Sequence, residues 1–115
     1  RDIKGNNFVL DADGHVVLTD FGFAKHVDDR TKNKSTCGTL AYIAPEVISP
    51  TGLGYGHEVD WWGLGVVLFT MLTGYFPFLR QHPAQTAKAI VSNALKFPPE
   101  CALSADARSL CAGLL

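Results

Sequence analysis

Two short apolar runs near the start of the chain flank a polar turn. Phe8-Val9-Leu10 and His15-Val16-Val17-Leu18 stand on either side of Asp11-Ala12-Asp13-Gly14. Asp-Gly between two β-prone runs is a strong hairpin signal, because glycine accepts the positive φ that a tight turn requires. The pattern therefore predicts a β-hairpin over residues 8–18.

The longest apolar segment runs from Glu58 to Thr73 and is hydrophobic on nearly every side. A helix of this kind is buried among neighbours. Gly74, followed by Pro77, is typical of a helix end. The sequence thus predicts one central helix over residues 58–73. Upstream, Pro45 is placed to open a short helix, since proline fits the first helical turn.

Two weaker helical patterns follow the central helix. The first covers residues 83–95, and the second begins at an N-cap, Ser104. Their expected apolar faces consist of Ala87, Ile90, Val91 and Ala94 in the first helix and Ala107, Leu110, Cys111 and Leu114 in the second. A hairpin followed by helices predicts an α+β fold. These elements leave the central helix short of neighbours, so we expect residues 1–115 to be an incomplete domain.

Composition and charge narrow the class of protein. The 115 residues are 47% hydrophobic and 18% charged, with a net charge of −1. This excludes a disordered chain and provides no basic footprint for nucleic acid or an anionic membrane. Three cysteines without a CxxC pair favour reduced thiols, and no signal-peptide or membrane-span pattern is present. We expect an intracellular protein, cytoplasmic or nuclear.

The candidate catalytic residues flank the predicted hairpin in the sequence. Asp2 and Asn7 precede its first strand, and Asp20 follows its second. If the hairpin brings both loops to one end, two carboxylates and an amide converge. That set suits a magnesium ion bridging phosphate oxygens, together with a base for a hydroxyl. Taken singly, each residue is more typical of an ordinary turn than of a catalytic site.

The order of these residues resembles the C-terminal lobe of eukaryotic protein kinases. Arg1-Asp2 matches the end of the HRD motif, and Asn7 matches the metal-binding asparagine five residues further on. Asp20-Phe21-Gly22 matches DFG, and Ala44-Pro45-Glu46 matches APE. Each motif is weak alone, but their common order and separations make the set specific. The resemblance implies a mostly helical lobe whose short β-hairpin carries the catalytic and DFG loops.

Finer matches point to one group of kinases. Lys4, two residues after Asp2, is similar to serine/threonine kinases. The segments 20–25, 37–39 and 60–62 resemble the AGC group. The resemblance therefore implies an AGC-like serine/threonine kinase.

The resemblance also implies roles for individual residues. Asp2 would orient the substrate hydroxyl and accept its proton, and Lys4 would neutralise charge on the transferring γ-phosphoryl group of ATP. Asn7 and Asp20 would hold Mg²⁺ against the ATP phosphates. Thr39 would line the substrate site and contact the catalytic aspartate.

Further implied roles concern regulation and support. Ser35 matches the activation-loop phosphosite, with Arg1 and Lys25 as its pairing residues and Thr31 and Thr36 as competing sites. An upstream activating kinase is then an implied partner, beside ATP and protein or peptide substrates. Glu46 and Asp60 match structural residues, of which Asp60 holds the catalytic loop.

Several departures from the family pattern limit these expectations. Asn6 and Thr70 stand where AGC kinases that prefer basic substrates commonly carry carboxylates. The residues given include no Gly-rich loop and no Val-Ala-Ile-Lys strand, so half of the ATP site lies outside them. We expect a partial kinase domain over 1–115 that lacks the N-terminal lobe and the C-terminal end, and that is inactive alone. The alternative is a truncated or non-catalytic module for interaction or regulation.

Overall fold

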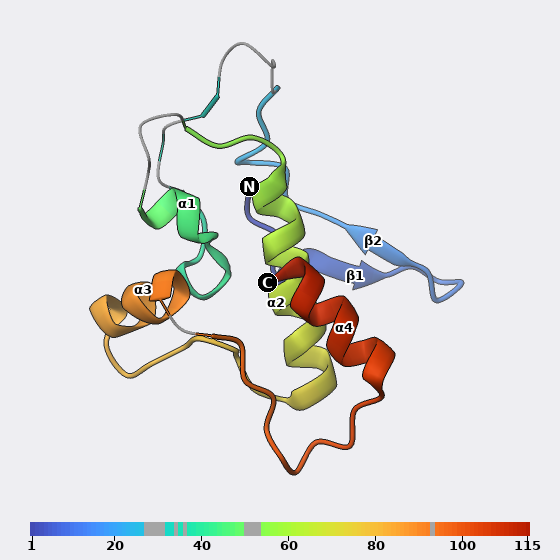
Figure 1. The fold of residues 1–115 in the computed structure, drawn as a ribbon. Helices are drawn as coiled ribbons and strands as arrows, with labels where there is room; N and C mark the ends of the chain where they lie inside the picture. The colour runs from blue at the N-terminus through green and yellow to red at the C-terminus, as the bar shows by residue number, and fades with distance from the viewer. Residues whose placement is uncertain (27–31, 34, 36, 50–53, 93) are drawn as a thin grey trace.

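The computed structural model describes residues 1–26, 32–33, 35, 37–49, 54–92 and 94–115. The elements found there are the 3-10 turns η1 (Gly5–Asn7) and η2 (Leu40–Tyr42), the strands β1 (Phe8–Leu10) and β2 (Val16–Leu18), and the helices α1 (Pro45–Ile48), α2 (Glu58–Thr73), α3 (Pro83–Ser92) and α4 (Ala105–Leu114). Figure 1 shows the hairpin on one side of α2, α1 and α3 on the other, and α4 along it. The predicted combination of helices with a small sheet is confirmed.

The hairpin forms where the sequence places it. β1 and β2 pair antiparallel, with Phe8 opposite Leu18, and Gly14 in the turn has φ +84°. β2 begins at Val16, one residue later than the predicted run. Just beyond the paired strands, the Thr19 N–H donates to the Asn7 carbonyl oxygen at 2.8 Å. Asn7 and Thr19, the residue before Asp20, therefore lie side by side at the open end of the hairpin.

Helix α2 has the predicted bounds. Its last turn closes on Gly74, which takes φ +77° and donates its N–H to the Thr70 carbonyl at 2.8 Å. At the other end, the Glu58 carboxylate accepts the Gly56 N–H at 2.8 Å. Gly63 on this helix leaves room for the first loop, since a Cβ there would lie 3.0 Å from Ile3. Residues 1–4 are thereby seated directly on α2.

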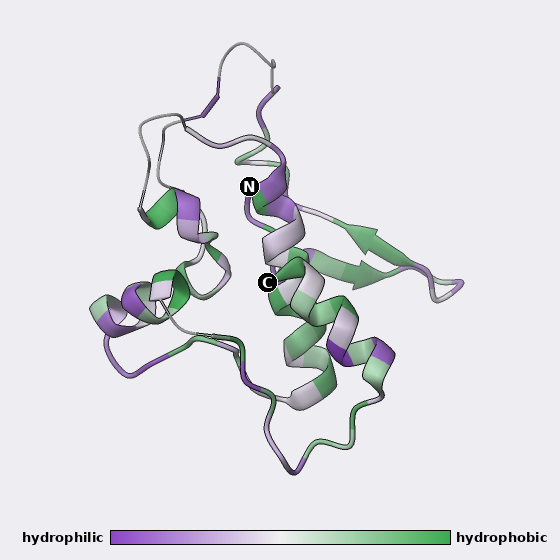
Figure 2. Cartoon of the chain, viewed as in Figure 1, coloured by the Kyte–Doolittle hydropathy of each residue, from purple (hydrophilic) through white to green (hydrophobic). Residues whose placement is uncertain are grey.

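The prediction that α2 is buried on every side is wrong for the described residues. Trp61 is 59% exposed and Met71 80% exposed. Beside Met71, an apolar pocket of about 510 Å³ lies between α2 and the hairpin. Its apolar lining includes Phe8, Val9, Leu10, Val16, Leu64 and Val67. Both strands are coloured as hydrophobic in Figure 2, in keeping with this apolar lining, to which Tyr42 of η2 also contributes.

Two clusters of core residues join α2 to α1 and α3. One cluster joins Ala44 and Val47 to Tyr55 and Val59. A second joins Phe78 to Ala89 and Ile90 on α3. Trp62 packs against both and stacks on Phe78, with ring centroids 5.7 Å apart. This one side chain therefore connects α1, α2 and α3.

Helix α3 differs from its prediction in length and in its buried face. It ends at Ser92, and Val91 and Ala94 are exposed, whereas Thr86 and Ala89 are buried. Thr86 tolerates burial because its hydroxyl accepts the Arg80 N–H at 2.9 Å. Ile90 of the predicted face is buried as expected, but a rule that counts threonine as polar misses Thr86 and places the buried face too far toward Val91 and Ala94.

Helix α4 follows its prediction more closely. The Ser104 side chain accepts the Ala107 N–H at 3.2 Å, which confirms the N-cap. Cys111 is buried, and burial raises the pKa of its thiol, whereas Leu110 from the same predicted face is 56% exposed. No helix in the described part of the chain is long and apolar enough to span a bilayer.

Candidate active site

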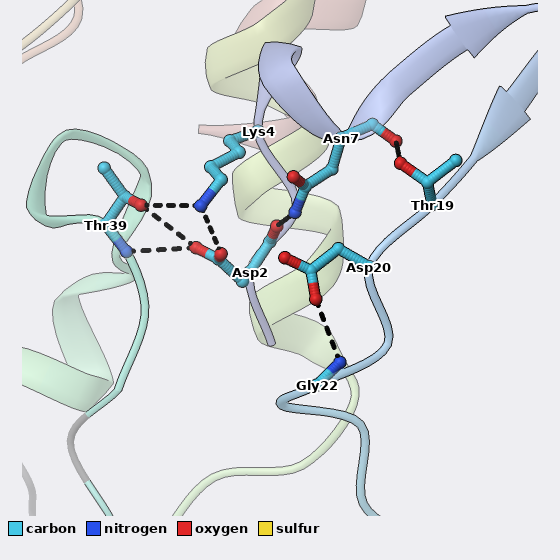
Figure 3. A network of polar contacts seen from close by, with 7 residues as sticks. All are labelled: Asp2, Lys4, Asn7, Thr19, Asp20, Gly22 and Thr39. Carbon is cyan, nitrogen blue, oxygen red and sulfur yellow. Dashed lines mark hydrogen bonds and ion pairs between the residues drawn. The ribbon is translucent and has the colours of Figure 1, made fainter.

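The Asp2 carboxylate is the centre of the polar network in Figure 3. Its Oδ1 accepts the backbone N–H and the hydroxyl of Thr39, each at 3.1 Å. Its Oδ2 lies 2.5 Å from the ammonium of Lys4, which also donates to the Thr39 hydroxyl at 3.3 Å. Thus three residues that the sequence places up to 37 positions apart meet at one carboxylate.

These contacts set the charge of the pair. Burial pushes the pKa of the Asp2 carboxyl upward, but hydrogen bonds from Lys4 and Thr39 outweigh it and hold that pKa below its ordinary value. The hydrogen bond to Asp2 in turn raises the pKa of Lys4, with a smaller contribution from the charge of Asp20. At neutral pH both groups are therefore charged.

Asn7 and Asp20 enter the same region from the two strand ends. Asn7 is buried, and its side-chain N–H donates to the Asp2 carbonyl at 2.9 Å. Asp20 has φ +60°, a left-handed conformation that aspartate tolerates when its side chain bonds locally, here to the Gly22 N–H at 3.1 Å. Asp2 and Asp20 line one pocket of about 250 Å³. The predicted convergence on one end of the hairpin is therefore present in the structure.

The donor set suits a hard divalent cation. Because the Asn7 amide donates through its nitrogen, its oxygen stays available as a ligand. Asp20 uses Oδ1 for the turn and is exposed, which leaves Oδ2 available. Carboxylate and amide oxygens are the ligands that Mg²⁺ prefers. The residues present therefore fit a magnesium ion that keeps further positions for phosphate oxygens and water.

Comparison with known proteins identifies the family of the chain. The whole chain, residues 1–115, matches the family model of the protein kinase domain. The chain belongs to the protein kinase family. It is 46% identical to the human RAC-beta serine/threonine-protein kinase over its full length, and 48% identical to yeast cAMP-dependent protein kinase type 3 over 86% of its length. A serine/threonine-protein kinase of Arabidopsis thaliana is 44% identical over the full chain.

This kinase segment spans about a quarter of those relatives, 23%, 24% and 23% of their lengths in the same order. The relatives are serine/threonine kinases of AGC type, which confirms the resemblance drawn from the motifs. The cysteines Cys37, Cys101 and Cys111 of the kinase segment are free thiols.

The expected regulatory residues are only partly brought together. The Arg1 guanidinium donates to the Ser35 hydroxyl at 3.0 Å and to the Phe23 carbonyl at 2.8 Å. Lys25, the second expected partner, makes no hydrogen bond or ion pair with Ser35 among the described residues. The competing sites Thr31 and Thr36 lie outside the residues that the structure describes.

Asp60 and Glu46, the two residues expected to have structural roles, differ in their contacts. The Asp60 carboxylate lies 2.9 Å from the main-chain nitrogen of Arg1. This contact places the start of the first loop beside the start of α2, and the structural role expected of Asp60 stays a prediction. Glu46 is half-buried in α1 and forms no ion pair in the described ranges.

One residue at this site has no counterpart in the motif analysis. Tyr55 is 3% exposed, and its hydroxyl contacts Arg1, Ser35 and Cys37. Its only local signal is an aromatic side chain between two glycines, Gly54 and Gly56. That pattern does not predict that the Tyr55 hydroxyl contacts residues 18 to 54 positions away in the sequence.

Proposed function

We propose that the protein containing this chain transfers the γ-phosphate of ATP to serine or threonine hydroxyls of other proteins. Residues 1–115 would form the part of its catalytic domain that runs from the catalytic loop through the central helix to α4, within the C-terminal lobe. The observation that carries the proposal is the Asp2 carboxylate, held by Lys4 and Thr39 next to a second carboxylate, Asp20.

The Asp2 carboxylate has room for one more donor. A carboxylate offers about four lone-pair sites, and three are used by Thr39 and Lys4. A substrate hydroxyl bound at the remaining Oδ2 position would be oriented for attack on the γ-phosphorus. Its oxygen forms the new P–O bond, the bond to the β–γ bridging oxygen breaks, ADP leaves, and the proton passes to Asp2. Because its lowered pKa makes Asp2 a weak base, orientation is its main contribution.

The remaining polar groups would neutralise the negative charge of the ATP phosphates. Lys4 is close enough to Asp2 to reach the transferring group with its ammonium, and its raised pKa keeps it charged. Asn7 and Asp20 would hold Mg²⁺ on the ATP phosphates. The ion would supply charge neutralisation of the leaving phosphate oxygens.

Ser35 phosphorylation by an upstream kinase would regulate this site. The Arg1 guanidinium already contacts the Ser35 hydroxyl, so a phosphate there gains a charge-assisted hydrogen bond. Lys25 is the second cation in our proposal and would reach the phosphate by a side-chain movement. We expect a Ser35→Ala protein to be less active than the phosphorylated enzyme, and equal activity would exclude the switch.

Strong selection of arginine-rich substrates is not part of the proposal. Asn6 is exposed and uncharged, and the Thr70 hydroxyl is bonded to the Val66 carbonyl of its own helix at 2.8 Å. Neither position offers a carboxylate to a substrate guanidinium. Protein substrates are therefore expected to be chosen by other contacts.

The test uses the full-length protein and its Asp2→Asn variant. Phosphate transfer from ATP to a mixture of serine and threonine peptides should fall by about 10²- to 10⁴-fold, the usual contribution of a positioned acid–base group. Asp13→Asn, on the exposed hairpin turn, is the matched control and should keep full activity. Absence of transfer by the unmodified protein would refute the kinase proposal and favour a non-catalytic interaction module.

The isolated polypeptide 1–115 is a separate case. Its residues include neither a Gly-rich phosphate loop nor the lysine strand that family members use for ATP. We expect it not to phosphorylate peptides and to bind ATP weakly. Peptide phosphorylation by the purified polypeptide would contradict this.

A further inference from the structure

The hydroxyl of Tyr55 lies where three segments of the chain meet. It donates to the Ser35 main-chain carbonyl, accepts from the Arg1 guanidinium at 3.4 Å, and lies 3.9 Å from the Cys37 sulfur. Tyrosine has one proton and two lone pairs to offer. With the Cys37 thiol as donor, all three are in use. The hydroxyl therefore uses its full hydrogen-bonding capacity and links three segments of the chain.

The position of this hydroxyl is fixed from two directions. The Tyr55 backbone forms an antiparallel bridge with Asn33, with N–H to carbonyl distances of 2.9 Å both ways. The approach depends on Gly54, since a Cβ there would lie 2.6 Å from the Asn33 carbonyl oxygen. The ring packs in the cluster of Ala44, Val47 and Val59. Backbone and ring together leave the hydroxyl little freedom to move.

Two of the three partners of the hydroxyl lie close in sequence to the residues of the Asp2 site. Arg1 is the covalent neighbour of Asp2, and Cys37 is two residues before Thr39. Thr39 supplies two of the three hydrogen bonds received by the Asp2 carboxylate. A tie between Arg1 and both Ser35 and Cys37 would therefore help to keep Thr39 close to Asp2, in addition to the direct hydrogen bond between Arg1 and Ser35 at 3.0 Å.

We propose that Tyr55 is a positioning residue whose hydroxyl keeps Thr39 on the Asp2 carboxylate. It touches neither the reacting groups nor the expected metal position, and acts through Arg1, Ser35 and Cys37. The catalytic consequence rests on the proposed kinase function. The structural consequence, a well-held Thr39 N–H, does not depend on it.

The experiment compares the full-length protein with its Tyr55→Phe variant, which keeps the ring and removes the hydroxyl. We expect hydrogen exchange of the Thr39 amide to accelerate about fivefold, the effect of losing one hydrogen bond. We expect kcat to fall by a similar factor while the KM for ATP stays unchanged, because the ring packing is kept. Tyr75→Phe, at an exposed tyrosine, is the matched control and should change neither quantity.

Each outcome decides a different point. Unchanged Thr39 exchange in Tyr55→Phe overturns the proposal whatever the activity. Faster exchange with unchanged kcat overturns the catalytic role of this residue. Faster exchange in a protein that transfers no phosphate supports the structural tie and refutes the kinase function. Cys37→Ala, which deletes only the thiol contact, should move Thr39 exchange in the same direction by a smaller factor and serves if Tyr55→Phe does not fold.

Discussion

The Thr39 hydroxyl offers the sharpest test of how the Asp2 carboxylate is held. Thr39→Val removes this donor but keeps the side-chain shape and the backbone N–H, which continues to donate to Asp2 at 3.1 Å. A hydrogen bond to a charged group contributes about 1.5–3 kcal/mol. Because Thr39 is exposed and Lys4 continues to donate, the low end of that range applies. About 1.5 kcal/mol corresponds to roughly a tenfold fall in kcat.

The same substitution changes the pH dependence in a defined direction. The Thr39 hydrogen bonds help to hold the pKa of Asp2 below its ordinary value. Removing one of them raises that pKa. Since Asp2 acts in its ionised form, activity is lost as pH falls through its pKa, and the acid limb of kcat/KM should move to higher pH.

The assay is peptide phosphorylation by the full-length protein as a function of pH. Thr39→Ser keeps the hydroxyl and should restore both kcat and the acid limb. Ser92→Ala removes an exposed hydroxyl whose hydrogen bond, among the described residues, goes to the Lys88 carbonyl of its own helix, and it should have no effect. If Thr39→Val keeps kcat within about twofold and leaves the acid limb in place, the assigned role of the Thr39 hydroxyl is wrong.

Two further predictions concern stability of the full-length protein. Gly54 and Gly74 share φ +77°, but only at Gly54 would an added Cβ approach the Asn33 carbonyl. Gly74→Ala should cost about 1–2 kcal/mol of stability, and Gly54→Ala should lower the unfolding midpoint further. Equal losses in the two variants would exclude the close approach at Gly54. Glu58→Gln should lose about 0.5 kcal/mol at pH 7. Hydrogen bonds from the Gly56 and Glu58 N–H groups lower the Glu58 pKa, so this stabilisation is present above the ordinary pKa and disappears as pH falls through the lowered one. A deficit that persists at acid pH would contradict this cause.

The elements with local signals were predictable from the sequence. Asp13-Gly14 fixed the hairpin turn, Gly74 ended α2, and Ser104 capped α4, each through chemistry within a few residues. The faces of α3 were less predictable. Thr86 is buried because the Arg80 N–H, six residues away, satisfies its hydroxyl, and periodicity alone carries no such information.

The difference between local and long-range signals also explains which features around the candidate site could be predicted. Asp2, Asn7 and Asp20 are found from motif spacing because the hairpin between them is itself a local structure. The exposure of Met71 and Trp61 is different, since it depends on which elements pack on α2. No periodicity of α2 contains that information, and an all-round apolar pattern predicts burial regardless.

Tyr55 shows why a motif list is an incomplete description of such a site. The motif residues supply the charges, but the distance between Asp2 and Thr39 depends on two segments that are 37 positions apart in sequence. Groups that touch both segments hold that distance: Lys4 bonds Asp2 and Thr39 themselves, and the Tyr55 hydroxyl contacts Arg1 on one side and Cys37 on the other. A protein that kept every motif residue and lost this hydroxyl would therefore keep the chemistry of the site while losing part of its geometry.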